Sequence, residues 1–193
     1  MAVVVASVRW LQEQVRGDTP SPRHGHAVSR IGDELYLFGG CSAKSEVIQG
    51  EEKKSKQNGD NVIFYNDLYK IEITSLEWHR LTQVGDIPSK RDGHSLCTIG
   101  KHLYLFGGKD HLLSIRNLKG LYLFDPHSLN WEKCETEGPE PRSLSNTVNV
   151  LKDKIYVFGG IHRSRASNNM WMLDTNVLVW TLVETSGLPP PRR

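Results

Sequence analysis

The sequence has few cysteines, no long hydrophobic run and little net charge, and each shortage excludes a class of protein. Among its 193 residues are three cysteines, Cys41, Cys97 and Cys134, without the close spacing of a zinc motif. So sparse and odd a set predicts reduced thiols inside a cell, in the cytoplasm or the nucleus. No apolar run approaches the roughly 20 residues of a membrane helix. The formal net charge of +2 gives no electrostatic case for nucleic acid.

Catalytic and cofactor-binding motifs are missing as well. The chain has no Gly-x-Ser-x-Gly, no phosphate-binding loop, no Cys-x-x-Cys and no His-Glu-x-x-His. We therefore predict a protein that is not an enzyme and binds no cofactor. His24 and His26 would share one face of a strand, but no third ligand lies near them in sequence, so we predict no metal site.

A repeated pattern fills most of the chain. The tripeptide Phe-Gly-Gly occurs at residues 38–40, 106–108 and 158–160. An arginine precedes the first glycine of each pair by 16, 16 and 17 residues: Arg23, Arg91 and Arg142. Each copy also has a tryptophan, ten residues after the start of an apolar segment: Trp78, Trp131 and Trp180. Such self-similarity is the signature of a repeat architecture.

Each repeat is expected to form four short strands. Aromatic and β-branched residues dominate the segments, and Gly, Pro, Asp and Asn separate them, with no sustained helical period. The glycine pair suits a turn that needs positive φ or leaves no room for a Cβ. The tryptophan is a large apolar plate that can fill the gap between adjacent sheets.

In its order of Arg-x-Gly-His, apolar-Tyr-apolar-Phe-Gly-Gly, aromatic strand and Trp, the chain resembles the kelch repeat from about residue 10 to residue 193. The resemblance implies an all-β, kelch-type β-propeller of about three four-stranded antiparallel blades in an incomplete ring. The third repeat departs from the pattern, because Arg142-Ser143-Leu144-Ser145 stands where Arg-x-Gly-His is expected.

The repeat divides the chain into one partial propeller. We expect an N-terminal closing strand and turn, three blades and the start of a fourth repeat, at residues 1–20, 21–84, 85–137, 138–186 and 187–193. Propellers typically close with four to eight blades, so we expect a truncated product. The competing interpretation is a homodimer that closes a six-bladed ring through open blade edges.

The first blade carries a long loop, expected at residues 41–63. Its polar stretch at residues 51–60 has almost no apolar anchor, so we expect it to be mobile. The segment is either a tolerated surface insertion or a partner-docking arm.

The resemblance places the candidate binding residues on one face. In kelch-like propellers, the turn before each first strand and the loop after each glycine pair project from the face that commonly binds partners. The residues carried over are Arg23, His24, Arg91, Lys109, His111, Arg142, Ser143, His162, Arg163 and Arg165. Basic residues dominate, which favours an acidic peptide or a free C-terminal carboxylate as ligand. The alternative is that the turn arginines hold neighbouring blades together and the loop arginines are solvated.

The function implied by the resemblance is protein binding without catalysis. One common role is substrate recognition for a ubiquitin ligase. The alternatives are a regulatory scaffold that binds a small GTPase or a transcription factor, and a kelch-like propeller enzyme. Fold alone does not choose among them.

Overall fold

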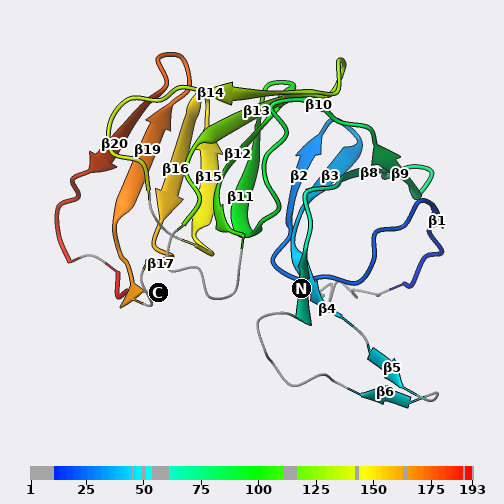
Figure 1. Ribbon diagram of the computed structural model, residues 1–193. Coiled ribbons are helices and arrows are strands. Elements are labelled where there is room, and N and C mark those ends of the chain that lie inside the picture. The colour runs from blue at the N-terminus through cyan, green and yellow to red at the C-terminus, as the bar shows by residue number, and fades with distance from the viewer. Residues whose placement is uncertain are drawn as a thin grey trace, which may run out of the picture.

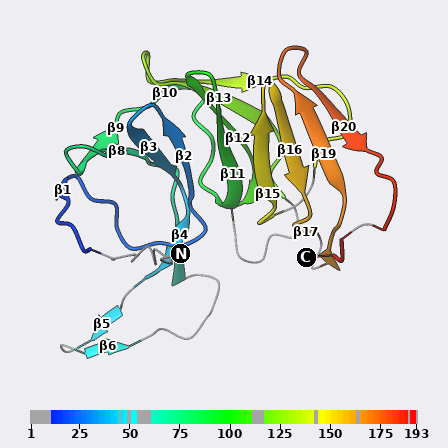
Figure 2. The same cartoon turned by 180° about the vertical axis from the view of Figure 1, so that it is seen from behind.

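The computed structural model describes residues 11–44, 46–48, 51–53, 61–110, 117–141, 144–162, 165–188 and 190–192 (Figure 1). These residues form β-strands joined by turns and loops, with no α-helix among them. Three sheets of four or five strands stand side by side, as the view from behind also shows (Figure 2). The prediction of an all-β fold with about three antiparallel blades and no closed ring is confirmed.

Each blade contains four antiparallel strands in chain order from its inner to its outer edge. The first blade consists of β2 (Ala27–Ile31), β3 (Glu34–Phe38), β8 (Leu68–Glu72) and β9 (Glu77–Leu81). The second consists of β11 (Asp92–Ile99), β12 (His102–Lys109), β13 (Leu121–Asp125) and β14 (Asn130–Cys134). The third consists of β15 (Thr147–Leu151), β16 (Lys154–Phe158), β19 (Met170–Asp174) and β20 (Val179–Val183). The described part of the chain contains no helix long and apolar enough to span a bilayer.

A short segment before each blade pairs in parallel with the outer strand of that blade. β1 (Arg16–Gly17) pairs with β9, and β10 (Val84–Gly85) pairs with β14. A single bridge between Glu137 and Val179 repeats this contact in the third blade. Of the N-terminal closing strand and turn expected at residues 1–20, the first ten residues lie outside the described residues.

A glycine makes each of these parallel contacts possible. Gly17, with φ +77°, lies so close to Trp78 that an added Cβ would overlap the tryptophan carbonyl oxygen. Gly138, with φ +80°, has the same relation to Trp180. Glycine adopts a positive φ at little cost and has no Cβ to collide with the tryptophan backbone, so it is the residue that fits both positions.

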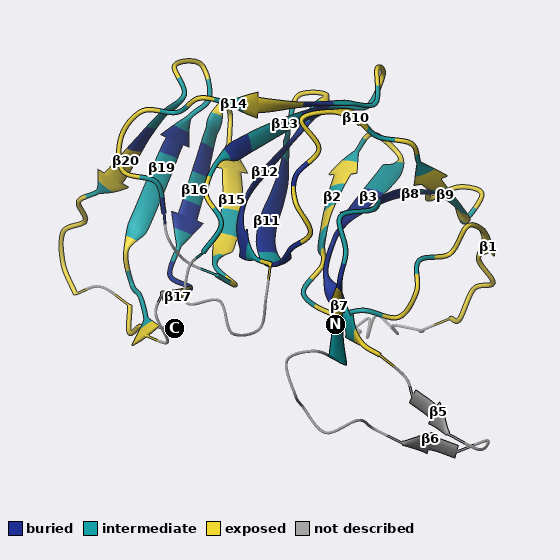
Figure 3. Cartoon of the chain, in the orientation of Figure 1, coloured by how far each residue is buried: buried dark blue, intermediate teal, exposed yellow. Residues whose placement is uncertain are grey.

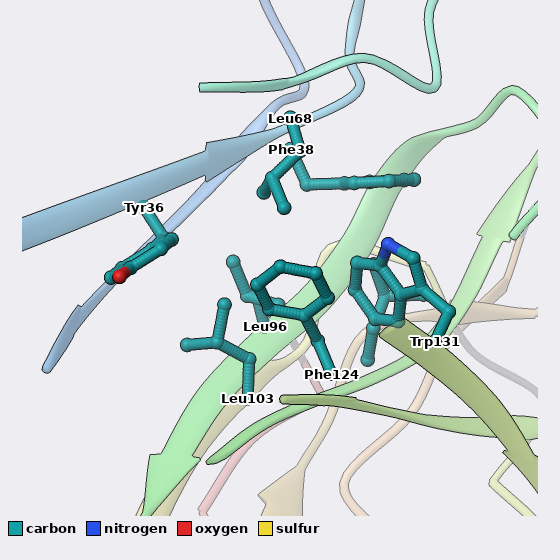
Figure 4. Packing of buried hydrophobic residues seen from close by; sticks show 8 residues of the cluster. Tyr36, Phe38, Leu68, Leu96, Leu103, Phe124 and Trp131 are labelled. Atoms are coloured by element: carbon teal, nitrogen blue, oxygen red, sulfur yellow. The ribbon is translucent and has the colours of Figure 1, made fainter. Parts of the chain in front are cut away.

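Phenylalanine and tryptophan side chains join neighbouring blades. Phe38 of the first blade packs edge-on against Trp131 of the second, with ring centroids 5.3 Å apart. Phe106 of the second blade packs in the same way against Trp180 of the third, also at 5.3 Å. Figure 4 shows Phe38 facing Trp131 in the hydrophobic cluster between the first and second blades. The predicted role of tryptophan as a filler between sheets therefore holds at both junctions.

The first and third blades each have one face without a neighbouring blade, and there the Phe–Trp contact lacks a partner within the described chain. Trp131 and Trp180 are 1% and 2% exposed, whereas Trp78 of the first blade is only half-buried. Phe158, the third blade's counterpart of Phe38 and Phe106, is likewise half-buried. Figure 3 shows β11 and β12 of the middle blade mostly buried and β15, at the inner edge of the third blade, mostly exposed. Each free face thus presents half of a Phe–Trp junction.

The segment expected as a long loop contains four strands. β4 (Cys41–Ala43) pairs with β7 (Val62–Phe64), which extends the first blade beyond its glycine pair. β5 (Glu46–Ile48) pairs with β6 (Glu51–Lys53) to form a hairpin that projects away from the blades (Figure 1). The expectation of a loop is therefore wrong for these strands, because β-ladder pairing continues past the turn. The residues between β6 and position 61 lie outside the described ranges.

Candidate functional site

One edge of the blade assembly gathers the segments from which a binding site would be built. The turns before β2, β11 and β15 and the segments after β3, β12 and β16 all lie at the lower edge in Figure 1. We call this edge the rim. β17 (Ile161–His162) and β18 (Arg165–Ala166) form a small hairpin on it in the third blade.

Backbone hydrogen bonds link the three turns of the rim across the blades. Gly93 N–H donates to the Gly25 carbonyl at 2.8 Å, and Ser145 N–H donates to the Gly93 carbonyl at 3.1 Å. All three residues have positive φ, between 52° and 65°. The rim is therefore a continuous backbone arc rather than a set of independent loops.

This arc also resolves the irregular third repeat. Ser145 takes the backbone conformation of Gly25 and Gly93, so Asn146 occupies the place of the repeat histidines. The spacing from Arg142 to Gly159 is one residue longer than in the other two repeats. Because Leu144 pairs with Ile161 as His24 pairs with Cys41, the extra residue lies in the sequence before Leu144. Ser95 Oγ donates to Asn146 Oδ1 at 2.6 Å. The amide of Asn146 therefore makes an inter-blade contact at the position where the repeat pattern has a histidine.

Two of the candidate arginines use their guanidinium groups within the fold. Arg91 is 1% exposed and donates to the carbonyl oxygens of Gly107, at 2.9 Å, and Ser89, at 3.0 Å. Arg23 donates in the same way to the carbonyl oxygen of Gly39, at 3.1 Å, and forms a salt bridge with Asp67. Both side chains thus fasten a rim turn to the glycine pair of their own blade. A binding role for them stays a prediction.

Three other candidates are more accessible. His24 and Arg165 are exposed, and Lys109 is half-buried at the end of β12. Only the backbone of His162 is described, as a partner of Arg165 in the β17–β18 hairpin. Four candidates lie outside the described residues: His111, Arg142, Ser143 and Arg163. The described rim therefore offers His24, Lys109 and Arg165 as cationic or polar contacts.

A buried histidine lies directly beneath the rim. His94 packs edge-on against the Phe38 ring at 5.5 Å, at the junction of the first two blades. Burial, with the nearby Arg91 charge, lowers the pKa of His94 to about 3. The imidazole is consequently neutral at physiological pH and serves packing rather than charge recognition.

A cluster of three polar side chains spans the same junction. Cys41 Sγ lies 3.3 Å from His24 Nε2 and 3.6 Å from Asp92 Oδ2. Burial and the Asp92 carboxylate raise the pKa of the Cys41 thiol to about 11. The free protein therefore holds a protonated thiol, which is a poor nucleophile. Sequence reasoning missed this cluster because its members are 17 and 51 residues apart.

The geometry defines kelch-type propeller blades with a one-sided loop rim, and comparisons with known proteins agree. Residues 48–193 match the family model described as the KLHDC2/KLHL20/DRC7 Kelch-repeats domain. The chain belongs to this family of kelch-repeat proteins.

Several proteins and one solved structure are similar to the chain. Host cell factor homolog hcf-1 of Caenorhabditis elegans is 30% identical, over 95% of the chain and 24% of its own length. Human Kelch domain-containing protein 3 is 26% identical, over 96% and 47% respectively. The solved structure of YjhT has a TM-score of 0.66 at 19% identity and covers 89% of the chain and 54% of its own. The chain thus spans about half or less of the proteins it resembles.

Proposed function

We propose that the chain is a non-catalytic protein-interaction module that binds its partner at the rim. The observation that carries the proposal is the family membership combined with loops gathered on one edge. Backbone hydrogen bonds between Gly25, Gly93 and Ser145 hold that edge in one shape. A rigid scaffold with variable loops is the usual support for a binding surface.

The ligand we propose is an acidic peptide segment or a free C-terminal carboxylate. Lys109 and Arg165 supply accessible cations on neighbouring blades, and His24 lies on the blade before them. A guanidinium group pairs with a carboxylate in bidentate fashion, whereas an ammonium group acts as a compact charge. The buried Arg23 and Arg91 support this surface by fixing the turns.

In the cell, we propose a role in substrate recognition for a ubiquitin ligase, in the cytoplasm or the nucleus. The three thiols are free, which fits a reducing compartment. The runner-up role is a regulatory scaffold for a small GTPase or a transcription factor. Capture of cullin or cullin-adaptor subunits by the chain would support the ubiquitin-ligase role, whereas turnover of a small molecule by the chain would support a propeller enzyme.

The free blade faces favour a second, separate property, which is self-association. Trp78 and Phe158 each present half of the contact that Phe38 and Trp131 complete inside the chain. Two copies arranged about a two-fold axis could pair Trp78 of each with Phe158 of the other. Light scattering at twice 21.9 kDa, lost on Phe158→Ala, would support this arrangement, and a folded monomer at all concentrations would contradict it.

Affinity capture followed by mass spectrometry tests the proposed function. The chain is compared with Lys109→Glu and Arg165→Glu, each made singly and together, and with Lys101→Glu, a control that matches each single charge reversal. Lys101 is exposed in the turn between β11 and β12, at the edge opposite the rim. We expect the rim variants to lose partners that the Lys101 variant keeps. Equal capture by all of these forms would refute binding at the rim.

A further inference from the structure

Three side chains at the rim carry the donor atoms of a metal site. His24, Cys41 and Asp92 each contribute one nitrogen, sulfur or oxygen atom, and these atoms lie within 4.8 Å of one another. Sulfur, imidazole nitrogen and carboxylate oxygen are the ligands that zinc takes in proteins. Zinc bond lengths of about 2.0–2.3 Å imply about 3.5 Å between neighbouring ligands of a tetrahedron. The Sγ–Nε2 and Sγ–Oδ2 distances of 3.3 and 3.6 Å are close to that spacing.

The backbone of two blades holds these residues together. His24 and Cys41 exchange backbone hydrogen bonds of 2.9 and 2.8 Å, just after the first glycine pair. Asp92 approaches from the second blade, where a Cβ on Gly25 would lie 3.0 Å from the aspartate Cβ. Because Gly93 is hydrogen-bonded to Gly25, the approach is fixed by backbone contacts. The donor positions are therefore preorganised before any ion binds.

The Asp92 carboxylate provides an independent observation. Asp92 is 7% exposed, and its Oδ1 has no hydrogen-bond partner among the described residues. Its Oδ2 lies against the sulfur of Cys41, which is fully buried. A buried carboxylate with an unused oxygen is costly unless a cation or a donor compensates it. Lys109 lies opposite Asp92 across the strand pair but donates no hydrogen bond to Oδ1, so a divalent cation on this carboxylate would supply compensation that the described residues do not.

The kelch repeat itself does not require these donors. The residues equivalent to His24 are Asp92 in the second blade and Leu144 in the third. Those equivalent to Cys41 are Lys109 and Ile161. The backbone pairing is the same in all three blades, so the pairing does not explain the donors. Among the residues that the structure describes, only the junction of the first two blades brings a thiol, an imidazole and a carboxylate together.

The arrangement does not resemble a nucleophilic triad. In a Cys–His–Asp triad, the carboxylate orients the imidazole and the imidazole activates the thiol. Here the carboxylate contacts the sulfur itself. A negative charge beside the sulfur opposes formation of a free thiolate but suits two ligands that share one cation.

We propose that His24, Cys41 and Asp92 bind one Zn²⁺ ion with an open fourth position. A thiolate, a carboxylate and a neutral imidazole carry two negative charges, which balance the ion, and the thiol proton is released on binding. Since His24 is exposed, the fourth position faces solvent on the rim. Lys109, which pairs with Asp92 across β11 and β12, lies beside it. A water molecule or a carboxylate of a rim ligand would fill the open position.

Titration of the chelator-stripped chain with Zn²⁺ and with Co²⁺ tests this site. Calorimetry should give one equivalent of Zn²⁺ with proton release, and Co²⁺ should produce a thiolate charge-transfer absorption. His24→Ala is the first variant, because an exposed side chain can be removed without harm to the core. Loss of one ligand should weaken Zn²⁺ binding by more than about 100-fold, since even residues behind the ligands change affinity by about 10- to 100-fold.

Two further variants identify the sulfur. Cys41→Ser should abolish the cobalt charge-transfer absorption, whereas Cys134→Ser, which changes a free thiol of the outer strand β14, should leave it intact. Circular dichroism establishes that each variant is folded. No stoichiometric binding to the wild-type chain, or an absorption that survives Cys41→Ser or His24→Ala unchanged, would overturn the proposal.

Discussion

Removal of the Trp131 side chain should test how strongly the blades depend on one another. Trp131 is 1% exposed and packs on Phe38 of the neighbouring blade and on Phe124 of its own, with ring centroids 5.3 and 4.9 Å away. Its Nε1–H donates to Gln83 Oε1 at 2.7 Å. An aromatic side chain of this kind buries about 200 Å². At about 25 cal/mol per Å², that area contributes about 5 kcal/mol.

We therefore expect Trp131→Ala to lower the free energy of unfolding by about 3–5 kcal/mol, the usual range for such truncations. Trp78→Ala is the matched control, because Trp78 has the same place in the repeat but is half-buried at a free face. It should cost about 1–2 kcal/mol, as is common for a partly exposed side chain. Urea unfolding followed by circular dichroism measures both, at a concentration where light scattering shows a monomer.

The free energies of unfolding of the two tryptophan variants can refute the proposed role of the junction. If Trp78→Ala and Trp131→Ala destabilise the monomer equally, the junction between blades is not what Trp131 stabilises. Since a 5 kcal/mol loss is comparable with the whole stability of a small domain, about 5–15 kcal/mol, Trp131→Phe serves as a milder variant. It should lie between the wild type and Trp131→Ala.

Three further predictions concern single positions. Gly138→Ala should destabilise the chain by at least about 2 kcal/mol more than Gly187→Ala, measured by urea unfolding, because both have positive φ but only Gly138 approaches a backbone. The folded pKa of His94, about 3, lies below the unfolded value of about 6.5, so protonation favours the unfolded chain and stability should fall as the pH drops from 6.5 toward 3. With a chelator present, His94→Asn should remove up to about 1.4 kcal/mol per pH unit of that slope. Arg91→Lys should lower the free energy of unfolding by about 2–3 kcal/mol and lower the melting temperature, because an ammonium group cannot replace the guanidinium fork that reaches the carbonyl oxygens of Gly107 and Ser89. Equal destabilisation by the two glycine variants, a pH slope unchanged by His94→Asn, or an unchanged melting temperature for Arg91→Lys would contradict the respective prediction.

The blade architecture could be predicted from the sequence because its signals are local and repeated. Each Phe-Gly-Gly and each tryptophan marks a position within a blade, and the constant spacing fixes their order. The junctions between blades follow from the same residues, since a blade can bury Phe38 only against a neighbour's Trp131.

Other features depend on contacts that no local pattern encodes. β1 and β10 are two residues long and exist only because Gly17 and Gly85 approach a tryptophan backbone. Ser145 adopts positive φ without being glycine, which hides the register of the third turn. The cluster around Cys41 is assembled from two blades, so it becomes visible only in three dimensions.

Selection from a library of displayed C-terminal peptides tests the central claim, which is recognition of an acidic or carboxylate ligand at the rim. We predict that the wild-type chain enriches acidic peptides, or peptides whose binding is lost when the C-terminus is amidated. The Lys109→Glu/Arg165→Glu variant should lose this enrichment, and Lys101→Glu should retain it. Enrichment unaffected by the rim variant, or no enrichment of carboxylate-bearing peptides by the folded wild-type chain, would contradict the account.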